Sequence, residues 1–98
     1  MTFRFYRFDK DDEHPMDRHS IVVMITYDGA EAITMKHRLQ DAYGMGRMVQ
    51  DVVREDSVVW MPGDYPPPPA SWYWDFGQYT CSFFLTEESQ ITYVKLII

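Results

Sequence analysis

The sequence predicts an α+β fold, with an antiparallel β-sheet of about four to six strands and one helix, or a kinked helix pair, packed on one face. Segments rich in β-branched and aromatic residues occur towards both ends of the chain. Between them lies a stretch whose apolar residues have helical spacing. The 98 residues, 46% hydrophobic and 24% charged, predict one folded domain over residues 1–98.

Two strands are expected before residue 28. Phe3 and Phe5 alternate with Arg4 and Tyr6 over residues 3–8, which is the period of a strand. Residues 19–27 are dense in β-branched side chains and predict a second, well-buried strand. The charged loop between them, closed by a proline, lets the two strands pair as a hairpin.

A helix is expected over about residues 30–43. Asp28-Gly29 is also typical of a tight hairpin turn, but Asp28 followed by Glu31 has the spacing of a capping box. Gly44 stands where a left-handed C-terminal cap is needed. The apolar positions follow at i, i+3, i+7 and i+10: Ala32, Met35, Leu39 and Ala42.

The segment after Gly44 is predicted as a second helical segment, or as a continuation of the first helix beyond a kink. Its apolar residues repeat at i, i+3, i+4, i+7 and i+8: Met45, Met48, Val49, Val52 and Val53. Three valines disfavour a helix, so a strand is the alternative. Residues 57–61 are expected to form a strand that enters a proline-rich loop.

The C-terminal part is expected to add strands. Residues 72–76 predict a short extended stretch, and residues 78–86 and 91–98 are apolar and rich in β-formers. The short link over 87–90 would join the last two as an antiparallel hairpin. A final strand at the end of the chain would leave an apolar edge.

Charge is unevenly distributed along the chain. The formal net charge is −6, with −1 in residues 1–50 and −5 in residues 51–98. Residues 55–93 contain no Lys, Arg or His but hold six carboxylates and ten of the sixteen aromatic residues. Such a surface repels phosphate, so no direct nucleic-acid binding is expected, and it suits a protein partner with a basic surface.

The candidate interface is centred on the loop 64–75. A run of four prolines at 66–69 would stiffen it, either as a ligand for an SH3- or WW-type groove or clasped by the neighbouring aromatics. In an extended stretch, Trp72 and Trp74 point to one side and Tyr73 to the other, so at least one face of this stretch should point outward. The alternative is that these aromatics form a mixed core. The predicted partner-binding residues are Glu55, Asp56, Asp64, Tyr65, Trp72, Tyr73, Trp74 and Asp75.

Catalytic and metal chemistry find little support. His14, Asp17 and His19 could hold a divalent metal, but their spacing matches no metal motif, so no metal site is predicted. Cys81 has no positive residue near it in sequence, which predicts a structural cysteine. The segment 44–46 has two glycines but follows a predicted helix, so no phosphate-binding loop and no cofactor are expected.

The composition therefore favours a small, acidic, non-enzymatic protein-binding module. Its size, acidity and single domain are similar in profile to phage-encoded inhibitors of host defence, such as anti-CRISPR proteins. That similarity implies an inhibitor that occupies a basic, nucleic-acid-binding surface of its target, although no motif carries it.

Two alternatives remain open. One is a metal-dependent or histidine-based enzyme that uses His14, Asp17 and His19, and the other is a homodimer formed through the C-terminal edge strand. A single cysteine, no signal-peptide pattern and no apolar run of membrane-spanning length predict a cytoplasmic protein without membrane contact.

Overall fold

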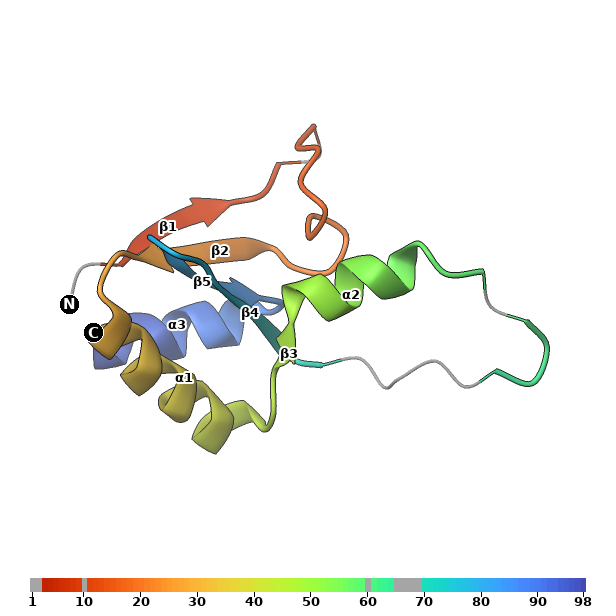
Figure 1. Ribbon diagram of the computed structural model, residues 1–98. Coiled ribbons are helices and arrows are strands. Elements are labelled where there is room, and N and C mark those ends of the chain that lie inside the picture. The colour runs from red at the N-terminus through yellow and green to blue at the C-terminus, as the bar shows by residue number, and fades with distance from the viewer. Residues whose placement is uncertain (1–2, 10, 60, 65–69) are drawn as a thin grey trace.

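The computed structural model describes residues 3–9, 11–59, 61–64 and 70–98. A five-stranded sheet with the order β1-β2-β5-β4-β3 forms its centre (Figure 1). Its strands are β1 (Arg4–Arg7), β2 (Val22–Thr26), β3 (Arg47–Met48), β4 (Trp72–Phe76) and β5 (Cys81–Leu85). All neighbours are antiparallel except β3 and β4, which are parallel. The α+β class is confirmed, but the sheet is mixed rather than purely antiparallel.

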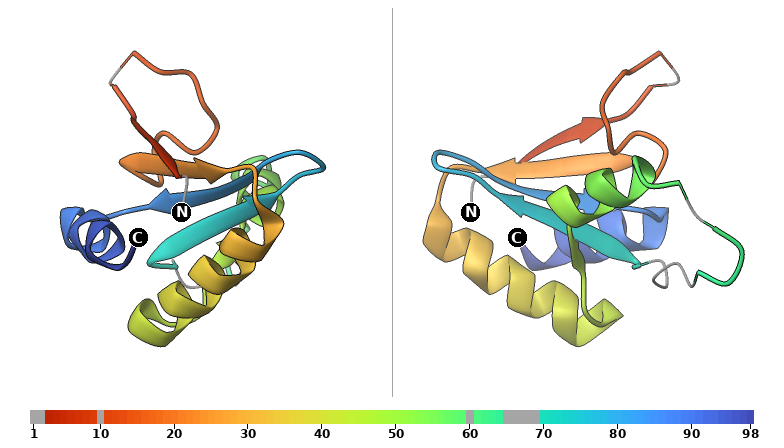
Figure 2. Two further views of the ribbon diagram at one scale, coloured as in Figure 1. Left: turned by 90° about the vertical axis from the view of Figure 1, so that its left-hand side faces the viewer. Right: turned by 45° about the vertical axis from the view of Figure 1, so that its right-hand side comes forward.

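Two helices, α1 (Gly29–Tyr43) and α3 (Glu88–Ile97), cover one face of the sheet (Figures 1 and 2). The larger core lies between them and the strands. Its buried members are Val22, Met24, Ala32, Met35, Leu39, Trp72, Phe83, Leu85, Ile91 and Val94. Burial of this apolar surface is the main force that holds both helices on the sheet.

The opposite face is also covered, by α2 (Val49–Asp56) and by the loop 8–21 between β1 and β2. Met16 from the loop and Val52 from α2 pack on Val23, Tyr73 and Phe84 of the strands. The prediction that helices cover only one face was therefore wrong. The second helical segment is separated from α1 by β3 and lies across the sheet from it (Figure 2).

Helix α1 agrees with its predicted position, and Ala32, Met35 and Leu39 are buried, but Ala42, expected on the same apolar stripe, is exposed. The side chain of Asp28 accepts hydrogen bonds from the backbone N–H groups of Ala30 and Glu31, at 2.9 and 3.2 Å. At the other end Gly44 has φ 82°, which favours glycine, although its ψ of −172° differs from the left-handed helical cap that we expected. The cap still works, because the Gly44 N–H donates to the carbonyl of Gln40.

The two predicted hairpin partners β1 and β2 pair antiparallel across the charged loop, with Tyr6 opposite Val23. Strand β5 is shorter than the predicted strand 78–86, because residues 77–80 form the turn that joins it to β4. In this turn the N–H of Gly77 donates to the carbonyl of Thr80 at 2.8 Å. Residues 72–76 form a full strand, as expected.

The predicted strand over 91–98 is wrong, because this segment belongs to α3. The β-branched residues there favour a strand locally, but a capping box starts a helix instead. The Glu87 side chain accepts from the backbone at Gln90, and the Gln90 side chain accepts from the Glu87 N–H. Ile91 and Val94 are then buried on one side of the helix. The C-terminal edge strand proposed for a homodimer therefore does not exist.

Residues 45–61 combine both of the alternatives that the sequence left open. Residues 47 and 48 form the short strand β3, and the helical spacing is confirmed from Val49, where α2 begins. Met45, expected in the core, is 76% exposed. The predicted strand 57–61 is wrong for its described residues, because the chain after α2 continues in a turn that leaves Val59 81% exposed.

The helices are short. The longest, α1, has 15 residues. Among the described residues, no helix combines the length and the apolar character needed to cross a membrane.

Candidate functional site: an acidic face with an aromatic groove

The net charge of the protein is concentrated on the α2 side of the sheet. The loop 8–21 and α2 contain eight carboxylates against three Lys or Arg, whereas α1 and α3 contain three of each. Met16 and Val52, which pack in one cluster, bring the loop and α2 together on this side. Five of the six excess negative charges are therefore carried by two segments that cover the same face. We call this side the acidic face.

A groove of about 410 Å³ opens on the acidic face where α2 does not cover the sheet. It is lined by Tyr6, Phe8, Asp12, His14, Val23, Ile25, Asp75, Ser82 and Phe84. The strand register explains why these residues line one groove. Tyr6, Val23 and Phe84 are aligned across β1, β2 and β5. Ile25, Ser82 and Asp75 form the next row on the same face of the sheet. We call it the aromatic groove.

The rings of the aromatic groove contact one another. The His14 ring centroid lies 5.4 Å from those of Phe8 and Phe84, and the Phe8 and Phe84 rings are parallel within 4° at 6.2 Å. Tyr6 packs edge-on against Phe8 at 5.9 Å. Phe84 is only 3% exposed and closes the base, whereas Tyr6 is 52% exposed and accessible.

Two carboxylates lie in the same groove. Asp12 accepts a hydrogen bond from the Tyr6 hydroxyl at 2.9 Å, and this bond is the main reason why the pKa of Tyr6 is raised. Asp75 is exposed, and no hydrogen bond or ion pair joins its carboxylate to another described residue. The groove thus combines ring faces with negative charge, an arrangement that attracts organic cations.

Two of the predicted interface aromatics are not on the surface. The Trp72 side chain is fully buried between the sheet and the helices α1 and α3, and its Nε1–H donates to the carbonyl of Gly44 at 2.8 Å. Tyr73 is 5% exposed and packs in the core on the other face, where burial raises the pKa of its hydroxyl. Alternation separates the two residues as predicted, but the expectation of an outward face is wrong because both faces are covered.

The other members of the predicted interface are dispersed. Trp74 is half-buried under the ammonium group of Lys36, 4.1 Å from its ring centroid, on the α1 side. Asp64 is exposed and accepts a hydrogen bond from the N–H of Met61 at 2.8 Å. Tyr65 and the prolines 66–69 lie outside the described residues. Among the described members of this set, only Asp75 lines the aromatic groove.

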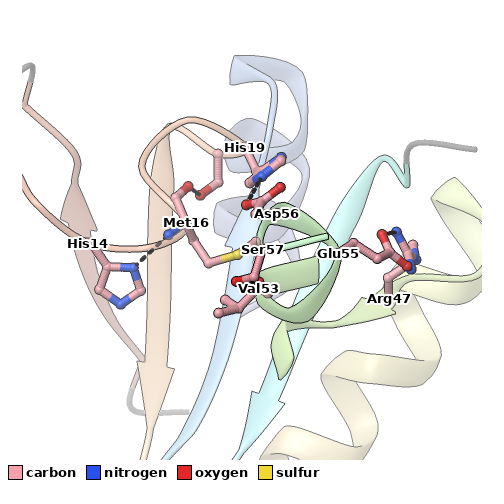
Figure 3. A network of polar contacts seen from close by, with 9 residues as sticks. His14, Met16, His19, Arg47, Val53, Glu55, Asp56 and Ser57 are labelled. Atoms are coloured by element: carbon pink, nitrogen blue, oxygen red, sulfur yellow. Dashed lines mark hydrogen bonds and ion pairs between the residues drawn. The ribbon is translucent and has the colours of Figure 1, made fainter. Parts of the chain in front are cut away.

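Glu55 and Asp56 lie on the acidic face but have cationic or histidine partners (Figure 3). Arg47 holds Glu55 in a bidentate ion pair, and its hydrogen bonds lower the pKa of that carboxyl. Asp56 lies 2.9 Å from Nε2 of His19 and ties the end of α2 to the loop 8–21. These two carboxylates therefore hold the acidic face together, and they are less available to a partner than unpaired carboxylates would be.

The histidines of the loop do not converge on one site (Figure 3). Nδ1 of His14 accepts a hydrogen bond from the N–H of Met16 at 3.0 Å, while His19 faces Asp56. No hydrogen bond or ion pair joins the side chain of Asp17 to either histidine. Within the described residues, no three His, Cys, Asp or Glu side chains come together as a metal site would require.

Cys81 has the setting of a structural thiol. It is partly buried against the larger core, at the turn-proximal end of β5. Burial is the main cause that raises the pKa of the thiol, and the neighbouring carboxylate of Asp75 adds to it. A raised pKa reduces the thiolate fraction and hence nucleophilic reactivity at neutral pH.

Of the nine residues that line the aromatic groove, sequence reasoning assigned only Asp75 to a partner-binding site, and it named His14 only in the alternative of a metal or histidine-based site. The signal for two others was present, because the period of a strand places Tyr6 and Phe8 on the same side of β1. No local pattern indicated that the loop 8–21 folds back over the sheet to bring Asp12 and His14 to these rings.

In comparisons with known proteins, no family model, no curated protein and no solved structure matches the chain.

Proposed function

We propose that this protein is a small, non-enzymatic binding module whose acidic face occupies a basic surface on another protein. One observation carries the proposal: eight carboxylates stand against three Lys or Arg in the loop 8–21 and α2, while the opposite helices are balanced. A charge difference between two sides of one small domain orients it towards a basic partner and accelerates the encounter.

The same charge argues against nucleic acid as the direct ligand. A protein that binds DNA or RNA gains much of its affinity by neutralising phosphates with Lys and Arg, and the acidic face would repel them. A partner surface that is rich in Lys and Arg is instead the complement of this face. Where such a surface normally binds nucleic acid, the module would compete with the phosphates and act as an inhibitor.

The proposal is tested with an oligo-arginine peptide as the basic probe and a DNA duplex as the acidic one. Immobilised protein should bind the peptide at low salt, lose much of this binding at physiological salt, and fail to bind the duplex at either. An excess of the protein should also displace a fluorescent duplex from the peptide.

A matched pair of variants separates the acidic face from net charge alone. Asp11→Asn with Glu13→Gln changes the loop, and Glu31→Gln with Asp41→Asn makes the same change in α1. Both pairs remove two charges. The loop variant should weaken peptide binding by about 2- to 30-fold if each exposed charge contributes roughly 0.2–1 kcal/mol, and the α1 variant should bind like the wild type. Equal loss in both variants, or binding of the duplex, would contradict the proposal.

A further inference from the structure

We infer that the aromatic groove is a binding site for an arginine side chain supplied by the basic partner. The inference rests on the proposed function and deepens it, because it names the group that enters the acidic face. Its volume of about 410 Å³ lies within the roughly 300–1,000 Å³ that is usual for ligand pockets, so a single long side chain fits with room to spare.

The ring faces provide the first part of the recognition. Tyr6, Phe8 and His14 line the groove above the buried ring of Phe84. A guanidinium group is planar and weakly hydrated, so it stacks on such rings at low desolvation cost. The attraction between a cation and a ring contributes about 0.5–1 kcal/mol at exposed sites.

The carboxylates provide the second part. No hydrogen bond or ion pair joins the carboxylate of Asp75 to another described residue, so both of its oxygens are available to a guanidinium fork. Asp12 is held in place by two donors, the Tyr6 hydroxyl and the backbone N–H of Asp9, each on a different carboxylate oxygen, and each oxygen keeps a further lone pair. Ser82 stands opposite Asp75 in the register and adds a hydroxyl to the same row.

The Nδ1 atom of His14 is already engaged, because it accepts a hydrogen bond from the backbone N–H of Met16. Among the residues that line the groove, none is Lys or Arg. Arg4 belongs to the same row of the sheet as Asp75 but lines a separate cavity with Tyr27 and Asp28.

An arginine fits this combination better than a lysine. The ammonium group of lysine is a compact, strongly hydrated charge that gains little from stacking, whereas the guanidinium satisfies a ring face and a carboxylate together. The groove offers both, since aromatic rings and a free carboxylate line the same depression.

The test is an NMR titration of the labelled protein with three capped tripeptides, in which glycine flanks arginine, lysine or citrulline. Citrulline has nearly the shape of arginine without its charge. The arginine peptide should shift the amide signals of Ile25, Ser82 and Phe84 most, and it should bind more tightly than the other two. Asp75→Asn should weaken it by roughly 2- to 10-fold, the range between an exposed ion pair and a charge-assisted hydrogen bond.

Two controls keep the outcomes distinct. Asp41→Asn removes the same charge from α1 and should leave the arginine peptide unaffected, and Tyr6→Phe should keep the ring contact that Tyr6→Leu loses. Equal binding of citrulline, or tighter binding of lysine, would overturn the arginine site. If oligo-arginine binds through the loop carboxylates while the tripeptide leaves the groove unshifted, the groove inference fails and the proposed function stands. If neither peptide binds, both fail.

Discussion

Replacing Gly46 by alanine should destabilise this protein, because the new methyl group would collide with the indole ring of Trp72. A Cβ built on Gly46 would lie 2.6, 2.7 and 2.8 Å from Cε2, Cδ2 and Cε3 of that ring. Ordinary van der Waals contact begins near 3.4 Å, so ring or backbone must move by about 0.8 Å. Trp72 is fully buried, and it cannot swing aside into solvent.

The size of the effect follows from three contributions. Forcing an extra methyl group into a packed core costs about 1–3 kcal/mol. Displacement of the ring also threatens its hydrogen bond to the carbonyl of Gly44, which is worth about 0.5–1.5 kcal/mol. Alanine restricts the unfolded chain and returns about 0.4–1 kcal/mol. The three ranges together give a net loss of roughly 0.5–4 kcal/mol, which corresponds to about 2–32 °C in Tm for a domain of this size.

Urea unfolding followed by tryptophan fluorescence and by far-UV circular dichroism measures this loss. Gly29→Ala is the matched control, because a Cβ at Gly29 meets nothing within 4 Å and the residue opens α1. This control should be as stable as the wild type or more stable by up to about 1 kcal/mol. Full stability of Gly46→Ala, or an equal loss in Gly29→Ala, would refute the placement of Trp72 beneath the turn that leads into β3.

Three further predictions address single groups. Gln90→Ala should lower the free energy of unfolding in urea by roughly 2–4 kcal/mol, because the buried amide links the start of α3 to two backbone groups. Gln50→Ala, at an exposed position, should change the free energy of unfolding little. Comparable losses in the two variants would count against the role of the Gln90 amide. The ion pair with Arg47 lowers the pKa of Glu55, so its contribution to stability should be present above the unfolded pKa of about 4.3 and be lost as the pH falls through the folded value. Glu55→Gln should therefore flatten the stability profile below about pH 5, and an unchanged slope would exclude the pair as a source of acid sensitivity. Burial raises the pKa of Cys81, so iodoacetamide should alkylate it more slowly in the native protein than in urea, and equal rates would show an exposed thiol.

The elements whose signals are local were predicted well. Helix α1 has its cap at Asp28, its apolar stripe and its terminal glycine within one short segment, and the cap and the glycine both bond neighbouring backbone groups. The pairing of β1 with β2 could also be predicted from the sequence, because each strand has a strand-like residue pattern and a single loop separates them. No distant contact was needed to decide either element.

Helix α3 shows where local preference fails. Its β-branched residues predicted a strand, yet the buried Gln90 side chain donates to the carbonyl of Ser71 at 2.6 Å and accepts from the N–H of Thr86 at 2.8 Å. The helix is thus anchored to residues beside β4 and β5. Such contacts outweigh the modest difference in propensity between helix and strand, and they are invisible until the chain is folded.

The sequence by itself determined the α+β class, the position of α1 and the excess of negative charge, because these depend on composition and on neighbouring residues. The tertiary structure decided where that charge lies. By linear position it belongs to the C-terminal half, but packing of Met16 and Val52 on one sheet face brings the N-terminal loop and α2 together as the acidic face. The same packing buries Trp72 and Tyr73 and opens the aromatic groove beside Asp75. Burial of apolar side chains and the register of the strands bring together residues that are far apart in the sequence, and no local sequence pattern predicts these contacts.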